Sequence, residues 1–204
     1  FFETMLQPLP APPPPARNGW AGAWLFLSDG DAATRALQRA LQATGATVSE
    51  VPVARATEAE GLLATQRWAG VVHAWNLPAT DPAALRWREL LACIKAAAGR
   101  EGEPARWVFL TSRGANALAQ SPLGGFVIGL QHEHPDWRPL QLEIDAGETA
   151  VEPCVPWLLD TTSSERRLVL RSGVICGQRL VEKTVAATPQ AIRADGSYLI
   201  TGAA

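Results

Sequence analysis

The stretch Trp24-Leu25-Phe26-Leu27-Ser28-Asp29-Gly30-Asp31 decides the fold class of this chain. Its first five residues form an apolar run with the length of a buried β-strand. Asp29-Gly30-Asp31 is typical of a turn. The residues from 32 to 44 carry Leu37 and Leu41 at helical spacing before Gly45, which suits a helix C-cap. The stretch therefore predicts a strand, a turn and a helix, the opening unit of an α/β sheet.

The same alternation continues along the chain. We expect further strands at 47–53, 70–76, 106–112 and 140–144, further helices at 57–66, 82–98, 123–133 and 154–159, and a closing hairpin over 168–175. The strand at 140–144 alternates apolar and polar residues, which favours a place near a sheet edge. This order predicts an α/β fold: a truncated Rossmann-like, doubly wound, mostly parallel sheet with flanking helices.

Composition shifts divide the chain into three parts. Prolines dominate residues 6–19, so we assign residues 1–19 to a proline-rich linker, from which Phe1, Phe2 and Leu6 could dock on a neighbouring surface. Residues 20–183 are assigned to one folded subdomain. Residues 184–204 are assigned to a connector and the first strand of a further domain.

Composition also limits the partners. The 204 residues are 47% hydrophobic and 19% charged, with a formal net charge of -2. Near-neutral charge argues against nucleic acid or an anionic membrane, and no apolar run reaches membrane-spanning length. No signal peptide is visible, and Cys93, Cys154 and Cys176 suit small buried hydrophobes in a reducing compartment. We therefore expect a cytoplasmic protein, and the missing initiator Met indicates a piece of a larger chain.

The turn after the first strand is a poor dinucleotide site. It has one glycine, Gly30, where the dinucleotide-binding pattern requires three, and it places Asp29 and Asp31 where a pyrophosphate would sit. Two carboxylates repel an anionic ligand and themselves satisfy a positive helix end. Glu50 stands about 20 residues on, where a ribose-binding acid is expected. Without the glycines, that spacing is only weak evidence for a dinucleotide site. We expect a degenerate cofactor site and no bound cofactor.

The end of the chain carries the opposite signal. Asp195-Gly196 indicates a turn, and Tyr198-Leu199-Ile200-Thr201 is typical of a short buried strand. Thr201 and Gly202 then open what should be a glycine-rich turn, where a pyrophosphate meets a helix N-terminus. These two are the candidate cofactor-binding residues, the start of a nucleotide loop that the sequence leaves unfinished.

The sequence does not indicate a metal site or a set of catalytic residues. His132 and His134 would point about 200° apart on one helix, so they indicate a helix end rather than a metal site. His73 stands in an apolar strand and is expected to be a hydrogen-bonded core histidine. Tyr198 is the only tyrosine, so a Tyr–Lys proton-transfer pair cannot form. We name no catalytic residue and no metal ligand.

Several segments, in one order, resemble the ketoreductase of type I modular polyketide synthases, specifically its structural subdomain, which has a fatty-acid synthase relative. The matching pieces are Gly70-Val71-Val72-His73-Ala74-Trp75, Trp107 to Ala115, Gly129 to Trp137, Leu140 to Asp145, Leu168 to Gly173 with Gln178-Arg179-Leu180, and Gly196-Ser197-Tyr198-Leu199-Ile200-Thr201-Gly202. The chain departs from that pattern at Gly124-Gly125-Phe126, where the family commonly has a Trp-Gly pair, and at Gln131, where it has an Arg.

The resemblance implies a division of labour. The structural subdomain would have lost its cofactor site and would stabilise a second, catalytic subdomain. That second half is similar to short-chain dehydrogenases, binds NADPH and reduces a β-keto group on a carrier-bound chain in antibiotic or lipid biosynthesis. Its Ser, Tyr and Lys would lie beyond Ala204. Implied partners are the catalytic subdomain and neighbouring synthase domains: a dehydratase, an enoyl reductase or an acyl carrier protein.

Two alternatives stay open. The chain could be a fragment of a complete short-chain-type ketoreductase whose active site lies C-terminal to it. It could instead be a free-standing α/β module that binds a small ligand, which requires a concave site with convergent polar groups. If the chain is the structural subdomain, it is not itself an enzyme, although we expect its multidomain parent to be one.

Overall fold

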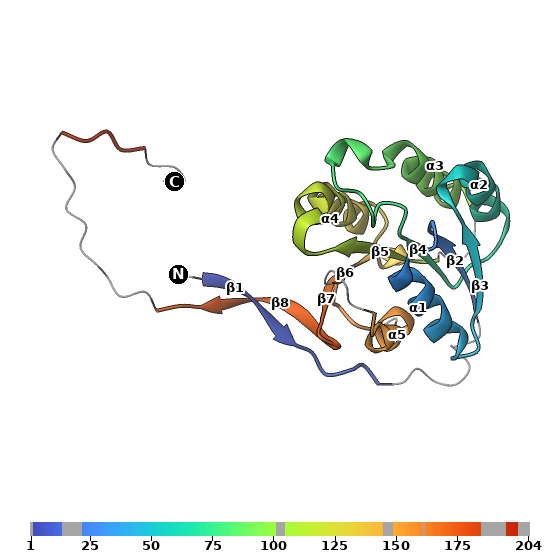
Figure 1. Ribbon diagram of the computed structural model, residues 1–204, viewed down its shortest axis with the longest axis horizontal. Coiled ribbons are helices and arrows are strands. Elements are labelled where there is room, and N and C mark those ends of the chain that lie inside the picture. The colour runs from blue at the N-terminus through green and yellow to red at the C-terminus, as the bar shows by residue number, and fades with distance from the viewer. Residues whose placement is uncertain are drawn as a thin grey trace.

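A computed structural model describes residues 2–13, 22–100, 105–144, 149–160, 162–184 and 195–199. One eight-stranded sheet runs through the molecule in the order β1-β8-β7-β6-β5-β4-β2-β3 (Figure 1). Its strands are β1 (Phe2–Pro8), β2 (Ala23–Leu27), β3 (Thr47–Val51), β4 (Gly70–His73), β5 (Arg106–Ser112), β6 (Leu140–Ile144), β7 (Arg167–Arg171) and β8 (Val174–Glu182). β2 to β7 are mutually parallel, whereas β8 and β1 are antiparallel additions.

Helices cover both faces of the parallel part. They are α1 (Ala32–Gln42), α2 (Ala56–Thr65), α3 (Trp87–Ala98), α4 (Ala117–Glu133) and α5 (Val155–Leu159). α1 and α5 pack on one face with Phe26, Val108 and Leu142, while α2, α3 and α4 pack on the other with Leu25 and Phe109 (Figure 1). The predicted α/β, Rossmann-like, doubly wound sheet is therefore confirmed. The apolar runs in β2 and β5 follow from burial on both faces.

The strand order places the sheet's switch point between β2 and β4. The chain moves from β2 to β3 on one side and then returns to β4 on the other. A complete dinucleotide-binding sheet has one more strand beyond the second one, in the order 3-2-1-4-5-6. Here β3 is the edge, so this side of the sheet is one strand shorter.

The helix predicted at 123–133 begins earlier, at Ala117, and runs through Pro122. Proline lacks the N–H that would bond the carbonyl of Leu118. The hydroxyl of Ser121 donates to that carbonyl instead, at 2.9 Å. The local loss is thereby offset, which is why this proline does not end the helix.

The expectation that the strand at 140–144 lies near an edge was wrong, because β6 is paired with β5 and β7. Its alternation has another cause. Leu140, Leu142 and Ile144 are buried in the core on the α1 and α5 face, whereas Gln141 and Glu143 point to the opposite face. An interior strand reads as half-polar when one of its faces is incompletely covered.

The assignment of residues 1–19 to a linker needs correction at its start. Phe2–Pro8 is strand β1 and pairs with β8 over seven residues, from Phe2 opposite Glu182 to Pro8 opposite Cys176. This pairing also extends β8 well beyond the predicted hairpin. The proline count hid the strand, because Pro8 lies at the end of the edge strand, a place that tolerates a missing N–H.

The buried strand predicted at 198–201 is not formed in its described part. Tyr198 and Leu199 lie outside any strand and are 56% and 91% exposed, and Ile200 and Thr201 lie outside the described residues. A short strand needs a neighbour to pair with. No pairing partner for Tyr198-Leu199 as a strand is formed among the described residues.

Candidate functional site

The two acids of the turn between β2 and α1 both accept backbone N–H groups, one at the start of α1 and one after β3. Asp31 is the N-cap of α1, and its Oδ1 accepts the N–H of Thr34 at 3.0 Å. Asp29 Oδ1 accepts the N–H of Val53, in the loop after β3, at 2.9 Å. The N-terminus that would face a pyrophosphate is therefore capped by a carboxylate.

A guanidinium lies against the glycine of this turn. Gly30 has a φ of +76°, and its N–H donates to the hydroxyl of Ser28 at 2.9 Å. A Cβ at position 30 would lie 3.0 Å from Nη2 of Arg35, so that side chain occupies the space beside the turn. Glycine suits this position because it adopts a positive φ without strain and because it has no Cβ to collide with Arg35.

The switch point itself is bridged from strand to strand. The N–H of Ala74 donates to the carbonyl of Leu27 at 2.8 Å, and the N–H of Ser28 donates to that of Val51 at 3.1 Å. The indole N–H of Trp75 also donates to Val51, at 2.9 Å. A crevice at the switch point is where open α/β sheets bind ligands. The two backbone bonds continue the strand pairing, and the Trp75 side chain spans the end of β2, from the end of β4 to the end of β3.

His73 ends β4 and is buried in the core, as the sequence predicts, but the predicted hydrogen bonds are absent. Neither ring nitrogen has a partner among the described residues. The ring lies 5.9 Å from the Trp75 ring and 5.6 Å from the Phe109 ring, centroid to centroid. Burial lowers the pKa of His73 to about 3, so the imidazole is neutral.

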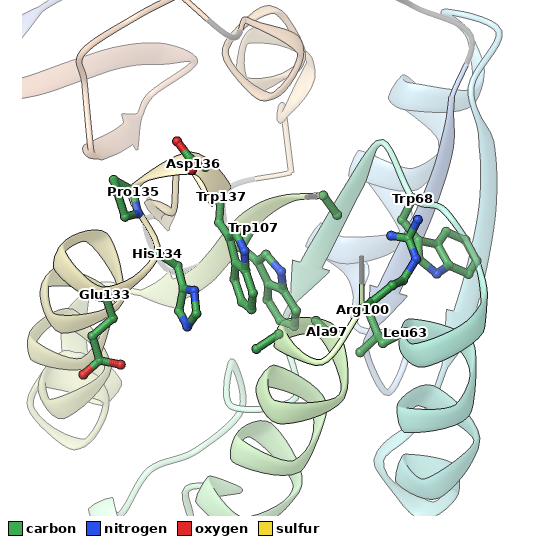
Figure 2. A pocket seen from close by; sticks show the side chains of 12 residues that line it. Leu63, Trp68, Ala97, Arg100, Trp107, Glu133, His134, Pro135, Asp136 and Trp137 are labelled. Atoms are coloured by element: carbon green, nitrogen blue, oxygen red, sulfur yellow. The ribbon is translucent and has the colours of Figure 1, made fainter. Parts of the chain in front are cut away.

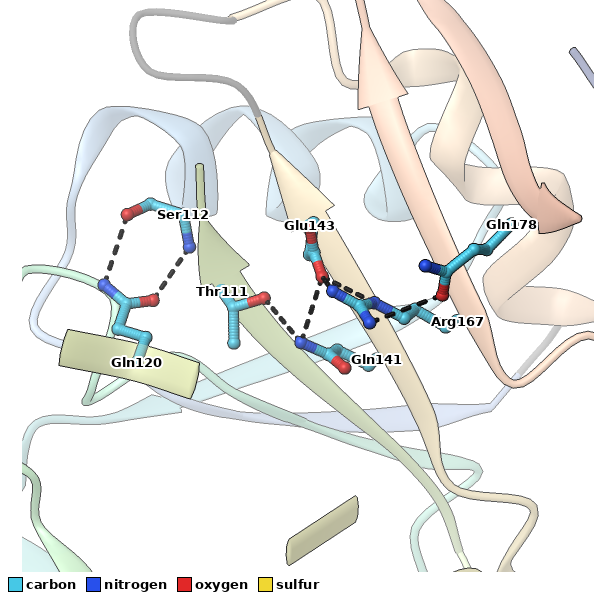
Figure 3. Close-up of polar contacts among 7 residues, drawn as sticks. All are labelled: Thr111, Ser112, Gln120, Gln141, Glu143, Arg167 and Gln178. Atoms are coloured by element: carbon cyan, nitrogen blue, oxygen red, sulfur yellow. Dashed lines mark hydrogen bonds and ion pairs between the residues drawn. The ribbon is translucent and has the colours of Figure 1, made fainter. Parts of the chain in front are cut away.

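An amide fixes the next carboxyl edge, where β5 meets α4. The amide oxygen of Gln120 accepts the N–H of Ser112 at 2.8 Å (Figure 3). Its NH₂ group donates to the Ser112 hydroxyl at 3.2 Å and to the carbonyl of Leu77 at 2.7 Å. Gln120 is 1% exposed. These groups tie α4 to the end of β5 and to the turn after β4, and none of them is a proton-transfer group at neutral pH.

Beyond α4, the sheet has an open face that we call the shelf. α2, α3 and α4 lie over the sheet as far as β6, and none of the described helices extends over β7, β8 or β1 on that side (Figure 1). The strand register places the following side chains on the shelf: Phe2, Thr4, Leu6, Gln141, Glu143, Arg167, Val169, Gln178 and Leu180.

The centre of the shelf is a polar network. Arg167 Nε donates to Glu143 at 2.7 Å, and an Nη atom of Arg167 also contacts this carboxylate (Figure 3). Gln141 donates to the Thr111 hydroxyl at 3.2 Å and to Glu143 at 3.3 Å. The outer rim is mixed: Phe2 and Leu180 are 73% and 74% exposed there, and Glu182 lies opposite Phe2 on the same face.

The outer side of α4 borders the shelf and is apolar. Leu118 and Ile128 are 81% and 58% exposed on this helix. Gly125 and Gly129 have no atom within 4 Å of a notional Cβ, so the helix backbone is accessible there. Glycines of this kind allow close approach of a second helix.

A cavity of about 240 Å³ lies at the amino-terminal edge of the strands, away from the turn between β2 and α1. His134 and Trp137 stack in its wall with ring centroids 4.2 Å apart, and Trp137 stacks on Trp107 at 5.7 Å (Figure 2). Open α/β sheets bind their ligands at the carboxyl ends of the strands. The cavity is therefore on the edge that such a site does not use.

The remaining predicted residues have simple outcomes. Thr201 and Gly202 lie outside the described residues. α4 ends at Glu133, between His132 and His134, which confirms the predicted helix end. Within the described ranges, no three His, Cys, Asp or Glu side chains gather as a possible metal site, and no helix is long and apolar enough to cross a membrane.

Sequence reasoning missed Gln120 and the shelf. A glutamine early in a helix carries no motif, and its partners Leu77 and Ser112 are distant in sequence. The alternation in β6 was the one signal of an uncovered face, and it was taken as a sign of an edge strand.

No protein-family model and no curated protein matches the chain. Among solved structures, it is similar to a C2-type ketoreductase from a modular polyketide synthase, with 19% identity and a TM-score of 0.66, covering 91% of this chain and 43% of that one. The fold is that of part of a polyketide synthase ketoreductase. The resemblance read from the sequence is thus confirmed at the level of the fold.

Two further structures agree. The first ketoreductase of the tylosin polyketide synthase matches with 20% identity and a TM-score of 0.64, over 90% of this chain and 41% of that one. A keto acid-selecting NRPS module, solved with its adenylation, ketoreductase and pseudo Asub parts, matches with 14% identity and a TM-score of 0.66, over 88% and 18%. The chain spans less than half the length of each of these ketoreductase-containing structures.

Proposed function

We propose that this chain is the non-catalytic structural subdomain of a polyketide synthase ketoreductase. It would stabilise a second subdomain that binds NADPH and reduces a β-keto group on a carrier-bound chain. The chain matches less than half of each similar ketoreductase structure. This supports the proposal that it is one part of a ketoreductase.

One observation carries the proposal: the place of a nucleotide is filled by the chain's own groups. Asp31 caps the helix, Arg35 lies against Gly30, and Trp75 bridges the switch point to Val51. A pyrophosphate at this turn would approach the carboxylates of Asp29 and Asp31, and each such like-charge contact costs several kcal/mol at short range. The parent's NADPH would then belong to the second subdomain.

The shelf and the outer side of α4 are proposed as the surface on which the second subdomain docks. Phe2 and Leu180 on the shelf, and Leu118 and Ile128 on α4, are large apolar side chains left exposed. We take these exposed apolar side chains, around the polar centre of the shelf, as the contacts of the second subdomain. The outer part of the β1 and β8 pair also needs support, since β7 pairs only with residues 174–177 of β8 and two strands alone are only marginally stable.

The test compares two chains by calorimetric titration with NADPH. We expect no binding by the 204-residue chain at millimolar cofactor, and micromolar binding by the parent chain extended through the second subdomain. Micromolar binding by the 204-residue chain would overturn the proposal. Failure of both chains to bind would argue against a reductase parent.

A neighbouring synthase domain, such as a dehydratase, an enoyl reductase or an acyl carrier protein, would be a partner of the whole module rather than of this surface. Affinity capture with the 204-residue chain separates these possibilities. We expect it to retain the separately expressed second subdomain and to release the acyl carrier protein. Equal retention of both would contradict a dedicated docking surface.

A further inference from the structure

The outer face of α4 lacks the charged residues that α1 and α3 expose. α4 has no Asp, Glu, Lys or Arg before its last residue, Glu133. In contrast, α1 exposes Arg35 and Arg39, and α3 exposes Arg88 and Lys95. A helix that is apolar all round is normally a buried helix. The composition of α4 therefore suits a helix that is covered on its outer side as well.

Large apolar side chains mark this outer face. Leu118 and Ile128 are 81% and 58% exposed. Pro122 and Gly125 lie between them at spacings of three or four residues, so these four positions follow one another along the same side of the helix. Exposed apolar side chains gathered on one uncharged face are typical of a surface that a partner covers.

The glycines of α4 differ in what surrounds them. A Cβ at Gly124 would lie 3.2 Å from Oε1 of Gln141, so the packing of α4 on the sheet accounts for that glycine. Beyond the helix's own backbone, none of the described residues has an atom within 4 Å of a Cβ built at Gly125 or Gly129, and neither glycine has a positive φ. Glycine weakens a helix relative to alanine. The described packing requires that loss at neither position.

Open space alone does not indicate a partner. Gly61 on α2 is equally open, but its exposed neighbours at helical spacing include Thr57, Glu58 and Thr65, which suit contact with water. On α4 the open glycines coincide with an uncharged face and with exposed apolar side chains. This coincidence separates α4 from α2 and makes Gly61 a matched control.

The spacing of Gly125 and Gly129 favours a helix as the covering element. The two glycines lie one turn apart on the same side of α4, about 6 Å along its axis at 1.5 Å per residue. They leave part of one i, i+4 row without side chains, and the i, i+4 ridge of a second helix can pack there at a short interaxial distance of roughly 8 Å. A strand would gain no pairing, because the helix backbone already has its hydrogen bonds.

The solved structures indicate where such a helix would come from. This chain covers 43% of the C2-type ketoreductase chain and 41% of the tylosin ketoreductase chain, so more than half of each lies beyond the matching part. We propose that a helix of the second subdomain crosses α4 at Gly125 and Gly129 and seats large apolar side chains over them. This inference rests on the proposed function and adds the element that docks and the two residues that admit it.

The experiment measures thermal unfolding of each variant in two lengths of chain: the 204-residue chain, and the parent chain extended through the second subdomain. Gly125→Ala and Gly129→Ala should each raise Tm of the 204-residue chain by up to about 2 to 4 °C, because alanine favours the helix and has space there. In the extended chain both should instead lower Tm, by at least about 2 °C, because the methyl group separates two closely packed helices. Gly125→Leu should widen this contrast.

The control and a fourth variant make the result specific. Gly61→Ala should raise Tm in both lengths of chain. If the variants at Gly125 and Gly129 also raise Tm in both, no helix packs closely there and the inference is wrong. Ile128→Glu then tests the proposed function: a lower Tm in the extended chain alone means that α4 is covered by another kind of element, whereas no change means that docking occurs elsewhere.

A second copy of the chain is the remaining occupant that the experiment distinguishes. If two copies paired through α4, the glycine variants would lower Tm of the 204-residue chain itself, and that Tm would rise with protein concentration. This outcome would overturn the assignment of the face to the second subdomain.

Discussion

Oδ1 of Asp31 accepts a hydrogen bond from the backbone N–H of Thr34 at 3.0 Å, and this bond begins α1 at the point where a cofactor phosphate would approach. The side chain is thus part of the fold. Asp31→Ala should lower the free energy of unfolding by about 1 kcal/mol, because a helix donor is left unsatisfied. Urea unfolding measures the change. Asp31→Ser keeps a capping oxygen and should lose much less; equal losses in both variants would show that charge, rather than capping, is what matters.

Gln120 should be among the most sensitive polar residues. Gln120→Ala leaves the Ser112 N–H and the Leu77 carbonyl without their partner, and it also opens a buried cavity. We expect a loss of about 2 to 4 kcal/mol in urea unfolding. Gln42→Ala, on the exposed end of α1, is the control and should stay within about 0.5 kcal/mol. Comparable small effects at both positions would contradict the bonding described for Gln120.

His73 should make the fold sensitive to mild acid. Its folded pKa, about 3, lies below its unfolded value near 6.5, so the unfolded chain binds the proton more readily. Stability is therefore lost as the pH falls below about 6.5, by up to about 1.4 kcal/mol per pH unit from this group. His73→Phe should remove that part of the slope between pH 6.5 and 4. Unfolding at pH 8, where the histidine is neutral in both states, gives the reference. If His73→Phe has the same slope as the unaltered chain, the prediction is wrong.

Two glycines should respond to alanine with opposite signs. A Cβ at Gly70 would lie 2.2 Å from the Trp24 ring, so Gly70→Ala must displace a buried indole and should destabilise the fold by about 1 to 3 kcal/mol. Gly61, within α2, has open space around it, and Gly61→Ala should stabilise by up to about 1 kcal/mol. Thermal unfolding of the two variants checks both signs. A loss at both positions would mean that backbone conformation, not space, is limiting.

The proposed docking surface can be tested without harming the fold. Ile128→Glu and Leu180→Glu place charges on exposed positions, so each should change the unfolding free energy by less than about 0.5 kcal/mol. Each should nevertheless weaken capture of the second subdomain at least tenfold, because a carboxylate would be buried there. Leu91→Glu, on the exposed side of α3, is the control and should capture normally. If all three variants capture alike, docking occurs elsewhere.

The sequence contained most of the fold because the parallel strands are apolar on both faces and alternate with helices. Trp24 to Leu27 and Trp107 to Leu110 read as buried strands and are buried strands. Errors arose where pairing depends on distant residues. β1 is a strand only because β8 accepts it, and Tyr198 was predicted in a strand that the described residues do not form.

The site was predictable only in part. Local rules identified Asp31 as the acid that caps the helix, since capping depends on residues a few positions apart. They also assigned Asp29 to the helix end, which was wrong, because its carboxylate bonds the N–H of Val53 instead. They could not identify Arg35 against Gly30, Trp75 on Val51, or Gln120 between two strands, because each contact joins groups that the fold brings together. The buried state of His73 followed from its apolar neighbours, whereas its missing hydrogen bonds depend on the tertiary packing.

The pairing of β1 with β8 has a consequence for synthesis on the ribosome. Glu3 and Lys183 form an ion pair across 180 positions of sequence. At 5 to 20 residues per second, the first strand leaves the ribosome roughly 10 to 40 s before its partner does. During that interval the nascent segment must remain soluble and unengaged. Glu3 and Pro8 suit this need, since a charge and a proline both discourage premature association of an edge strand with other chains.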